Sequence, residues 1–71
     1  MSTEVKAPMV GKIIAVKVEV GQNVGEDEDM FIMEAMKMEI PVGAPVAGTV
    51  KEIKIAAGKS VESDEVLAII G

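Results

Sequence analysis

The sequence predicts an all-β fold built from two similar halves, and three observations support this prediction. Residues 5–34 align with residues 42–71 without a gap, at a constant offset of 37 positions. Short runs rich in Val and Ile alternate with charged residues and are punctuated by Gly, which is typical of half-buried strands and tight turns. Helix is not favoured: residues 29–38 are the one candidate, and the matching residues 66–70 have the composition of a strand.

The repeat is defined by ten identical pairs and by further positions at which one apolar residue replaces another. The identical pairs are Val5/Val42, Ala7/Ala44, Pro8/Pro45, Gly11/Gly48, Lys17/Lys54, Gly21/Gly58, Val24/Val61, Asp27/Asp64, Glu28/Glu65 and Ile32/Ile69. A chain of 71 residues supplies one domain at most. We therefore expect residues 1–71 to form a single domain with repeat halves 5–34 and 42–71.

Each half is expected to contribute four strands in the same order. In the first half we expect strands over residues 4–8 and 12–20, a very short strand at Val24 and a strand over 30–33; in the second half, strands over 39–45 and 49–55, a very short strand at Val61 and a strand over 66–70. The alternation of Val16, Val18 and Val20 with Lys17 and Glu19 supports the second of these strands.

The alternation slips at the same place in both halves. Ile13 and Val16 are three residues apart instead of two, and so are Val50 and Ile53. A β-bulge keeps both residues of such a pair facing the core, so we expect a bulge in each copy, where the strand bends between two sheets. Turns should follow each of these strands, with Gly21 and Gly58 at positive φ.

Composition narrows the possible functions. The chain has no Cys, His, Trp or Tyr, and its seven basic residues are all lysines, so thiol chemistry, an imidazole base and the usual zinc ligands are missing. The net charge of −5 repels phosphate, so nucleic acid is not an expected partner. The acidic run 26–29 lacks the ligand spacing of a calcium loop, and no metal site is predicted. No stretch approaches membrane-spanning length, so we expect a cytoplasmic protein without direct membrane insertion.

Lys37 is the most distinctive residue, because it lies in the join between the halves, residues 35–41, where the repeat has no counterpart. It stands between two methionines in the run Glu34-Ala35-Met36-Lys37-Met38-Glu39. This run resembles the attachment sequence of biotinyl domains, the carrier domains of biotin-dependent carboxylases and decarboxylases. The resemblance extends to the Ala-Pro-x-x-Gly opening of each half and to the Gly21 and Gly58 turns.

The resemblance implies a flattened β-barrel of two four-stranded antiparallel sheets, with Lys37 at the tip of the central hairpin. It also implies that biotin forms an amide with Lys37 and that this residue's neighbours form a recognition sequence. Those neighbours are Glu34, Ala35, Met36, Met38 and Glu39. The implied partners are a biotin protein ligase and the biotin carboxylase and/or carboxyltransferase subunits between which the arm carries a carboxyl group. The domain would be a carrier and not itself an enzyme.

Two alternatives remain open at this point. Lipoyl domains share the fold and also present a lysine at the central hairpin, but an Asp usually precedes that lysine and an Ala follows it. Met36 and Met38 therefore favour biotin. The second alternative is an unmodified β module that binds partners through its acidic surface.

The repeat also makes a prediction about the ends of the chain. Glu34 and Val42 flank a short connection, so their counterparts Gly71 and Val5 should lie beside each other, far from Lys37. The gapless offset also leaves no room for the inserted "thumb" of the bacterial acetyl-CoA carboxylase carrier.

Overall fold

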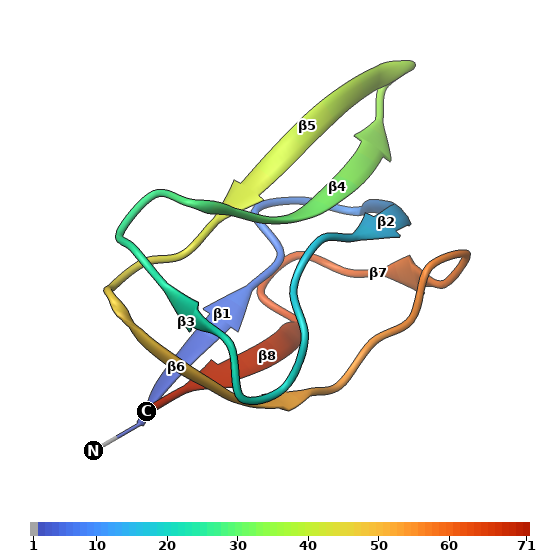
Figure 1. Cartoon of the computed structure of the whole chain (residues 1–71). Helices are drawn as coiled ribbons and strands as arrows, with labels where there is room; N and C mark the ends of the chain where they lie inside the picture. Colours follow the sequence, from blue (N-terminus) through green and yellow to red (C-terminus); the bar gives the residue numbers. More distant parts are fainter. Residues whose placement is uncertain (1) are drawn as a thin grey trace.

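The computed structural model describes residues 2–71, so Met1 of the expected domain lies outside the described residues. The predicted all-β fold is confirmed: two four-stranded antiparallel sheets face each other, without a helix in the described part of the chain (Figure 1). The strands are β1 (Thr3–Lys6), β2 (Gly11–Val16), β3 (Asn23–Val24), β4 (Asp29–Ala35), β5 (Met38–Gly43), β6 (Gly48–Ile53), β7 (Ser60–Val61) and β8 (Val66–Ile70). Across residues 2–71 no helix has the length and apolar character needed to cross a bilayer.

Each sheet combines strands from both halves of the repeat. We call the sheet with the order β5-β4-β2-β7 the hairpin sheet and the one with the order β1-β8-β6-β3 the terminal sheet. The registers of the two sheets correspond residue by residue at the offset of 37. For example, Val42 pairs with Phe31 in the hairpin sheet, and Val5 pairs with Ala68 in the terminal sheet. The two halves therefore have the same backbone pairing and exchange their short strands β3 and β7.

Both predicted bulges are confirmed. The register shifts between Ile13 and Ala15 on β2 and at the matching place between Val50 and Glu52 on β6. The bulge allows Ile13 and Val50 to be fully buried, each pointing into the core between the sheets.

The predicted length of the second strand was wrong. β2 ends at Val16 instead of continuing to Val20. Val18 is still buried, and the amide of Lys17 donates to the carbonyl of Met30 at 2.8 Å, but Val20 is 62% exposed. Val18 and Val20 lie on the segment that leaves β2, after its pairing with β4 has ended, and leads to β3 in the other sheet.

Paired backbone hydrogen bonds explain several identities in the repeat. The amides of Asp27 and Asp64 donate to the carbonyls of Ala44 and Ala7, at 2.8 and 2.9 Å. Both aspartates have positive φ, 68° and 66°, and both alanines are buried. One glutamate in each acidic turn also accepts a hydrogen bond from a backbone amide, Glu28 from Gly25 and Glu65 from Glu62. The hydrogen bonds of Asp27 and Asp64 connect each acidic turn to the segment that follows the first strand of the other half.

The predicted positive φ of Gly21 and Gly58 is confirmed, at 92° and 93°. A valine at either position has space, because nothing lies within 4 Å of an added Cβ, but its backbone would be strained. We expect Gly21→Val and Gly58→Val each to cost about 1–3 kcal/mol, which thermal unfolding will show as a loss of at least about 5 °C in Tm. Gly25→Ala is the matched control. The φ of Gly25 is not positive, and a Cβ added there would have room. Melting temperatures equal to that of the parent would contradict the strain argument.

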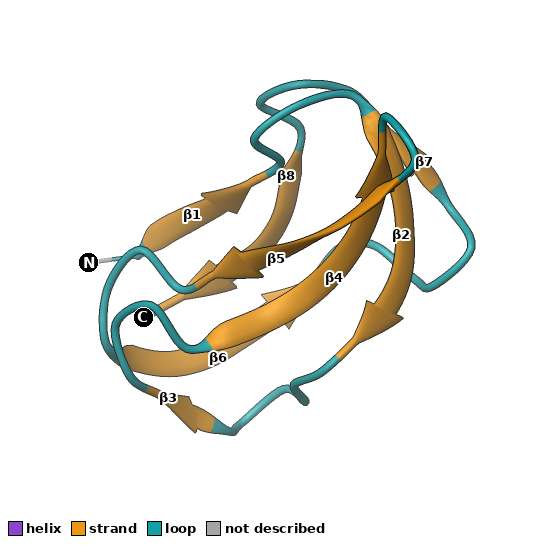
Figure 2. Ribbon diagram, turned by 90° about the horizontal axis from the view of Figure 1, so that it is seen from above, coloured by secondary structure: helices purple, strands orange, loops and turns teal. Residues whose placement is uncertain are grey.

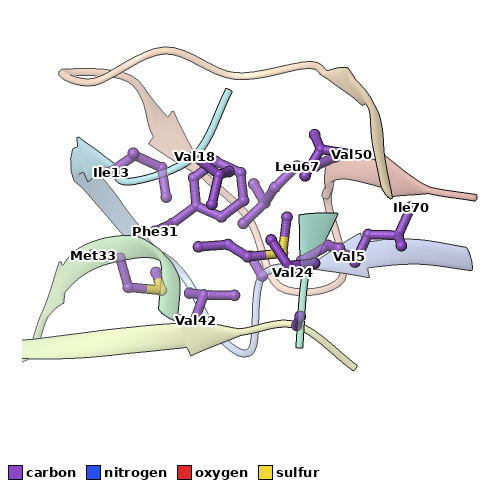
Figure 3. Packing of buried hydrophobic residues seen from close by; sticks show 14 of the residues in the cluster. Val5, Ile13, Val18, Val24, Phe31, Met33, Val42, Val50, Leu67 and Ile70 are labelled. Carbon is purple, nitrogen blue, oxygen red and sulfur yellow. The ribbon is translucent and has the colours of Figure 1, made fainter. Parts of the chain in front are cut away.

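The core lies between the sheets and draws on both halves. Met30, Phe31 and Met33 on β4 are fully buried, and so are Leu67 and Ile70 on β8. They share one cluster with residues of β1, β2 and β6 (Figure 3). Met30 and Met33 therefore serve packing, as do their repeat counterparts Leu67 and Ile70.

The ends of the described chain lie together in the terminal sheet (Figure 2). Thr3 pairs with Ile70, so β1 and β8 are neighbours, as expected. Within this pairing Val5 itself lies opposite Ala68, three residues before Gly71. The repeat relation holds, but most of residues 35–41 belong to the ladder of the hairpin, in which Glu34 pairs with Glu39 and Val42 pairs with Phe31.

Candidate functional site

The central hairpin places Lys37 at its tip. Ala35 at the end of β4 pairs with Met38 at the start of β5, which leaves Met36 and Lys37 as a two-residue turn (Figure 1). Both turn residues have positive φ, 54° and 64°. Positive φ at both central residues is the signature of a type I′ turn, whose twist matches that of the two strands. We call residues 35–38 the hairpin tip.

The turn is unusual because neither central residue is glycine or asparagine. A left-handed conformation costs roughly 1–2 kcal/mol for an ordinary L-residue. Such conformations persist where the surroundings fix them. Here the ladder between β4 and β5 continues from Ala35 and Met38 down to Asp29 and Gly43, so a change of turn would require a shift of the whole register. The hairpin therefore fixes the direction in which Lys37 leaves the barrel.

The side chains of the hairpin tip differ sharply in exposure. Met36 is 82% exposed and Met38 is 62% exposed, and Lys37 between them is also exposed. Ala35 is buried, with its methyl group turned toward β2. The tip thus presents one primary amine between two flexible thioethers, above a packed base.

Gly11 at the start of β2 supports the base of the hairpin tip. A Cβ added to Gly11 would lie 2.6 Å from the carbonyl oxygen of Glu34 and 3.2 Å from the Cβ of Ala35. The backbone of β2 and β4 can approach this closely only without a side chain at position 11. The sequence marked Gly11 as part of the repeat but did not connect it with Lys37.

Gly11→Ala should displace the end of β4 and the turn that it carries. We expect changed amide chemical shifts and faster amide hydrogen exchange over residues 34–38, measured by NMR. Gly48→Ala is the matched control, because an added Cβ there meets the side chain of Ile70 at 2.6 Å, in the terminal sheet. That variant should lose stability without disturbing residues 34–38. Identical tip spectra for Gly11→Ala and parent would show that Gly11 does not position the tip.

Two acidic residues flank the tip. Glu34 and Glu39 pair directly across β4 and β5, and both are exposed. Within residues 2–71, ion pairs form between Lys6 and Glu4 and between Lys54 and Glu52, and neither Glu34 nor Glu39 takes part in one. Like charges directly opposite each other are unfavourable in a sheet, so packing of the fold does not explain this pair.

The structure gathers all of the predicted site residues on one hairpin: Glu34, Ala35, Met36, Lys37, Met38 and Glu39. Their chemistry is limited. A lysine amine is a nucleophile only when it is neutral, and it is mostly protonated near pH 7. The chain contains no histidine, and no cluster of acidic residues in the described range has the arrangement of a metal site. The arrangement presents one exposed primary amine at the end of a fixed hairpin.

Comparison with known proteins gives the family. A family model described as "Biotin-requiring enzyme" matches residues 3–70. The chain is 57% identical over 35 residues to the gamma subunit of methylmalonyl-CoA decarboxylase from Veillonella parvula, which covers 49% of this chain and 27% of that protein. It is also 40% identical over 42 residues to the biotinylated protein TB7.3 homolog of Mycolicibacterium smegmatis. This match covers 59% of this chain and 59% of that protein. The matches therefore span less than two thirds of either relative.

Solved structures show the same architecture. A domain of the urea carboxylase of Kluyveromyces lactis superimposes with a TM-score of 0.94 and 30% identity, covering 100% of this chain and 6% of that one. A single-chain, multi-domain long-chain acyl-CoA carboxylase superimposes with a TM-score of 0.89 over 96% of this chain and 7% of that one. The latter match, at 22% identity, supports the fold alone.

Proposed function

Because the chain belongs to the family of biotin-requiring enzymes, we propose that it is a biotin carboxyl carrier and that Lys37 is the residue to which biotin is attached. The attachment is an amide between the biotin carboxyl group and Nζ of Lys37. One relative is a named biotinylated protein and another is a subunit of a decarboxylase, and both support this assignment.

The observation that carries the proposal is the position of Lys37 in the exposed turn. Of the seven lysines, this one alone lies in the join between the repeat halves, between two exposed methionines. The hairpin fixes its backbone, while its four-methylene side chain remains free to enter another protein's active site. A rigid base with a flexible arm is what a group carrier requires.

The residues around Lys37 leave its activation to another protein. The chain offers no base at the tip, so a biotin protein ligase must bring activated biotin and take up the proton of the amine. When bound, biotin supplies a ureido nitrogen that can accept and release a carboxyl group. The tether keeps this group at high effective concentration for a biotin carboxylase and/or a carboxyltransferase subunit. The carrier itself is not catalytic.

Peptide mapping after reaction with a biotin protein ligase, ATP and biotin tests the proposal. We expect one biotin per chain, on the peptide that contains Lys37. A parallel reaction with a lipoate ligase, ATP and lipoic acid tests the alternative, because a lipoyl carrier would gain the lipoyl mass there and no biotin in the first reaction. Biotin on any of the other six lysines, or no modification of the folded protein, would contradict the assignment.

A further inference from the structure

The outer face of the hairpin sheet carries a row of apolar side chains. Phe31 and Met33 point into the core, so Ile32 between them points outward. Ile32 pairs with Ala15 on β2 and with Pro41 on β5, and paired residues share a face of the sheet. The bulge on β2 adds Ile14, which is 37% exposed, beside Ala15. We call Ile14, Ala15, Ile32 and Pro41 the outer patch.

The repeat provides an internal control for this patch. At the offset of 37, its counterparts on the terminal sheet are Lys51, Glu52, Ile69 and Glu4, in the same register and with the same bulge. There, Nζ of Lys54 lies 3.3 Å from Oε2 of Glu52, and Nζ of Lys6 lies 3.8 Å from Oε1 of Glu4. The backbone therefore accepts charged residues at three of these four positions, and the fold does not require apolar ones. Contact with another molecule would account for the apolar residues of the outer patch.

The charges beside the outer patch indicate the character of that molecule. Glu34 and Glu39 form the next row toward the tip, directly opposite each other. Lys12 is the neighbour of Glu34 on β2, yet no ion pair joins them in the described structure. Lysine or arginine side chains on a partner would relieve the repulsion between the two glutamates. The expected partner surface is therefore apolar with a basic border.

The position of the outer patch relative to Lys37 favours one kind of partner. The pair Ile32–Pro41 lies three residues from Ala35–Met38, the last pair before the turn, which corresponds to roughly 10 Å along the strands. A ligase acting on the bare lysine must bring its reacting centre to the tip itself. An enzyme that receives the longer biotinyl-lysine arm can dock at a surface set back from the tip, as the outer patch is.

We propose that the outer patch is the docking surface for the enzyme subunit that exchanges carboxyl with biotin on Lys37. The subunit would meet the patch with apolar side chains and place basic residues near Glu34 and Glu39. This inference rests on the proposed carrier function. The patch consists of four residues, and a contact of this size forms a weak and transient complex. A carrier that must leave one active site for another requires this kind of contact.

The repeat also supplies the test variants. Ile14→Lys/Ala15→Glu introduces the residues that the terminal sheet carries at its own bulge, and Pro41→Glu introduces the counterpart Glu4, so the fold should tolerate both. Lys51→Ile/Glu52→Ala makes the reciprocal change on the terminal sheet and is the matched control. The probes are the purified biotin carboxylase and carboxyltransferase subunits of a biotin-dependent enzyme that accepts the biotinylated parent. Their Kd values are measured by NMR titration of each folded, isotope-labelled variant.

We expect both patch variants to raise the Kd for at least one subunit by about tenfold or more. The control variant should bind like the parent, and the rate of biotinylation by the ligase should be unchanged in all variants. In the parent, the titration should perturb the amides of Ile14 and Ile32.

Unchanged Kd values in folded patch variants would overturn the inference. A loss of ligase rate alone would assign the patch to the ligase. Self-association of the parent that the patch variants abolish, seen by sedimentation, would assign it to a second copy of the chain. Failure of the carrier function itself looks different, because the parent would then carry no biotin on Lys37.

Discussion

Lys37→Arg should leave the fold intact and abolish biotin attachment completely. The side chain of Lys37 is exposed in the turn, so arginine can replace it without entering the core. Arginine keeps the positive charge and the reach, but its guanidinium group does not act as the acyl acceptor that the ligase requires. Mass spectrometry after the ligase reaction should show no added biotin, and the Tm should match that of the parent within about 2 °C.

Lys59→Arg is the control for this experiment. Lys59 is also exposed and also adjoins a turn residue at positive φ, Gly58, but it lies within the repeat. It should be biotinylated at the same rate as the parent. If Lys37→Arg still accepts one biotin, the attachment site is another lysine and the proposed role of the hairpin fails.

Phe31→Ala should have the largest effect on stability of any core truncation. Phe31 is the one aromatic residue of the chain, and it is fully buried within the cluster of Figure 3. Removal of a buried phenylalanine ring costs about 3–5 kcal/mol. That cost is a large part of the roughly 5–15 kcal/mol that holds a domain folded. We expect the Tm to fall by at least about 15 °C.

The counterpart of Phe31 in the second half is Ala68, which is also fully buried. The two halves therefore fill one core unequally, with an aromatic ring on β4 where β8 carries a methyl group. Val20→Ala is the matched control, because Val20 is largely exposed and should cost at most about 0.5 kcal/mol. A decrease in Tm of less than about 5 °C for Phe31→Ala would mean that the ring does not organise the core.

The sequence predicted the parts of the fold that depend on burial. The three-residue spacings at Ile13 and Val50 indicated the bulges, and the range of β8 agrees with the expected strand at residues 66–70. The end of β2 was missed for a physical reason. An alternating pattern reports which side chains face the core, not which amides have a neighbouring strand. Val18 is buried two residues after the ladder has ended at Val16.

The candidate site was predicted in composition but not in geometry. A lysine without a repeat partner identified the join, and all six predicted residues lie on its hairpin. The type I′ turn was not foreseen, because Met-Lys lacks the glycine or asparagine that usually marks such a turn. Its conformation follows from the register between β4 and β5, which is set by pairs far along the strands. The outer patch was also missed, since its apolar residues are distinctive only once their charged counterparts are known to share the same backbone geometry.

The placement of β8 has a consequence for synthesis on the ribosome. This last strand lies inside the terminal sheet, between β1 and β6, so neither strand has its full set of partners until β8 is available. A nascent chain in which residues 66–70 are not yet free to pair cannot close the barrel, although Lys37 has already been synthesised. A ligase that requires the fixed hairpin would therefore not act on chains in which β8 has yet to pair. In this way the strand order would restrict attachment to chains in which the barrel has closed.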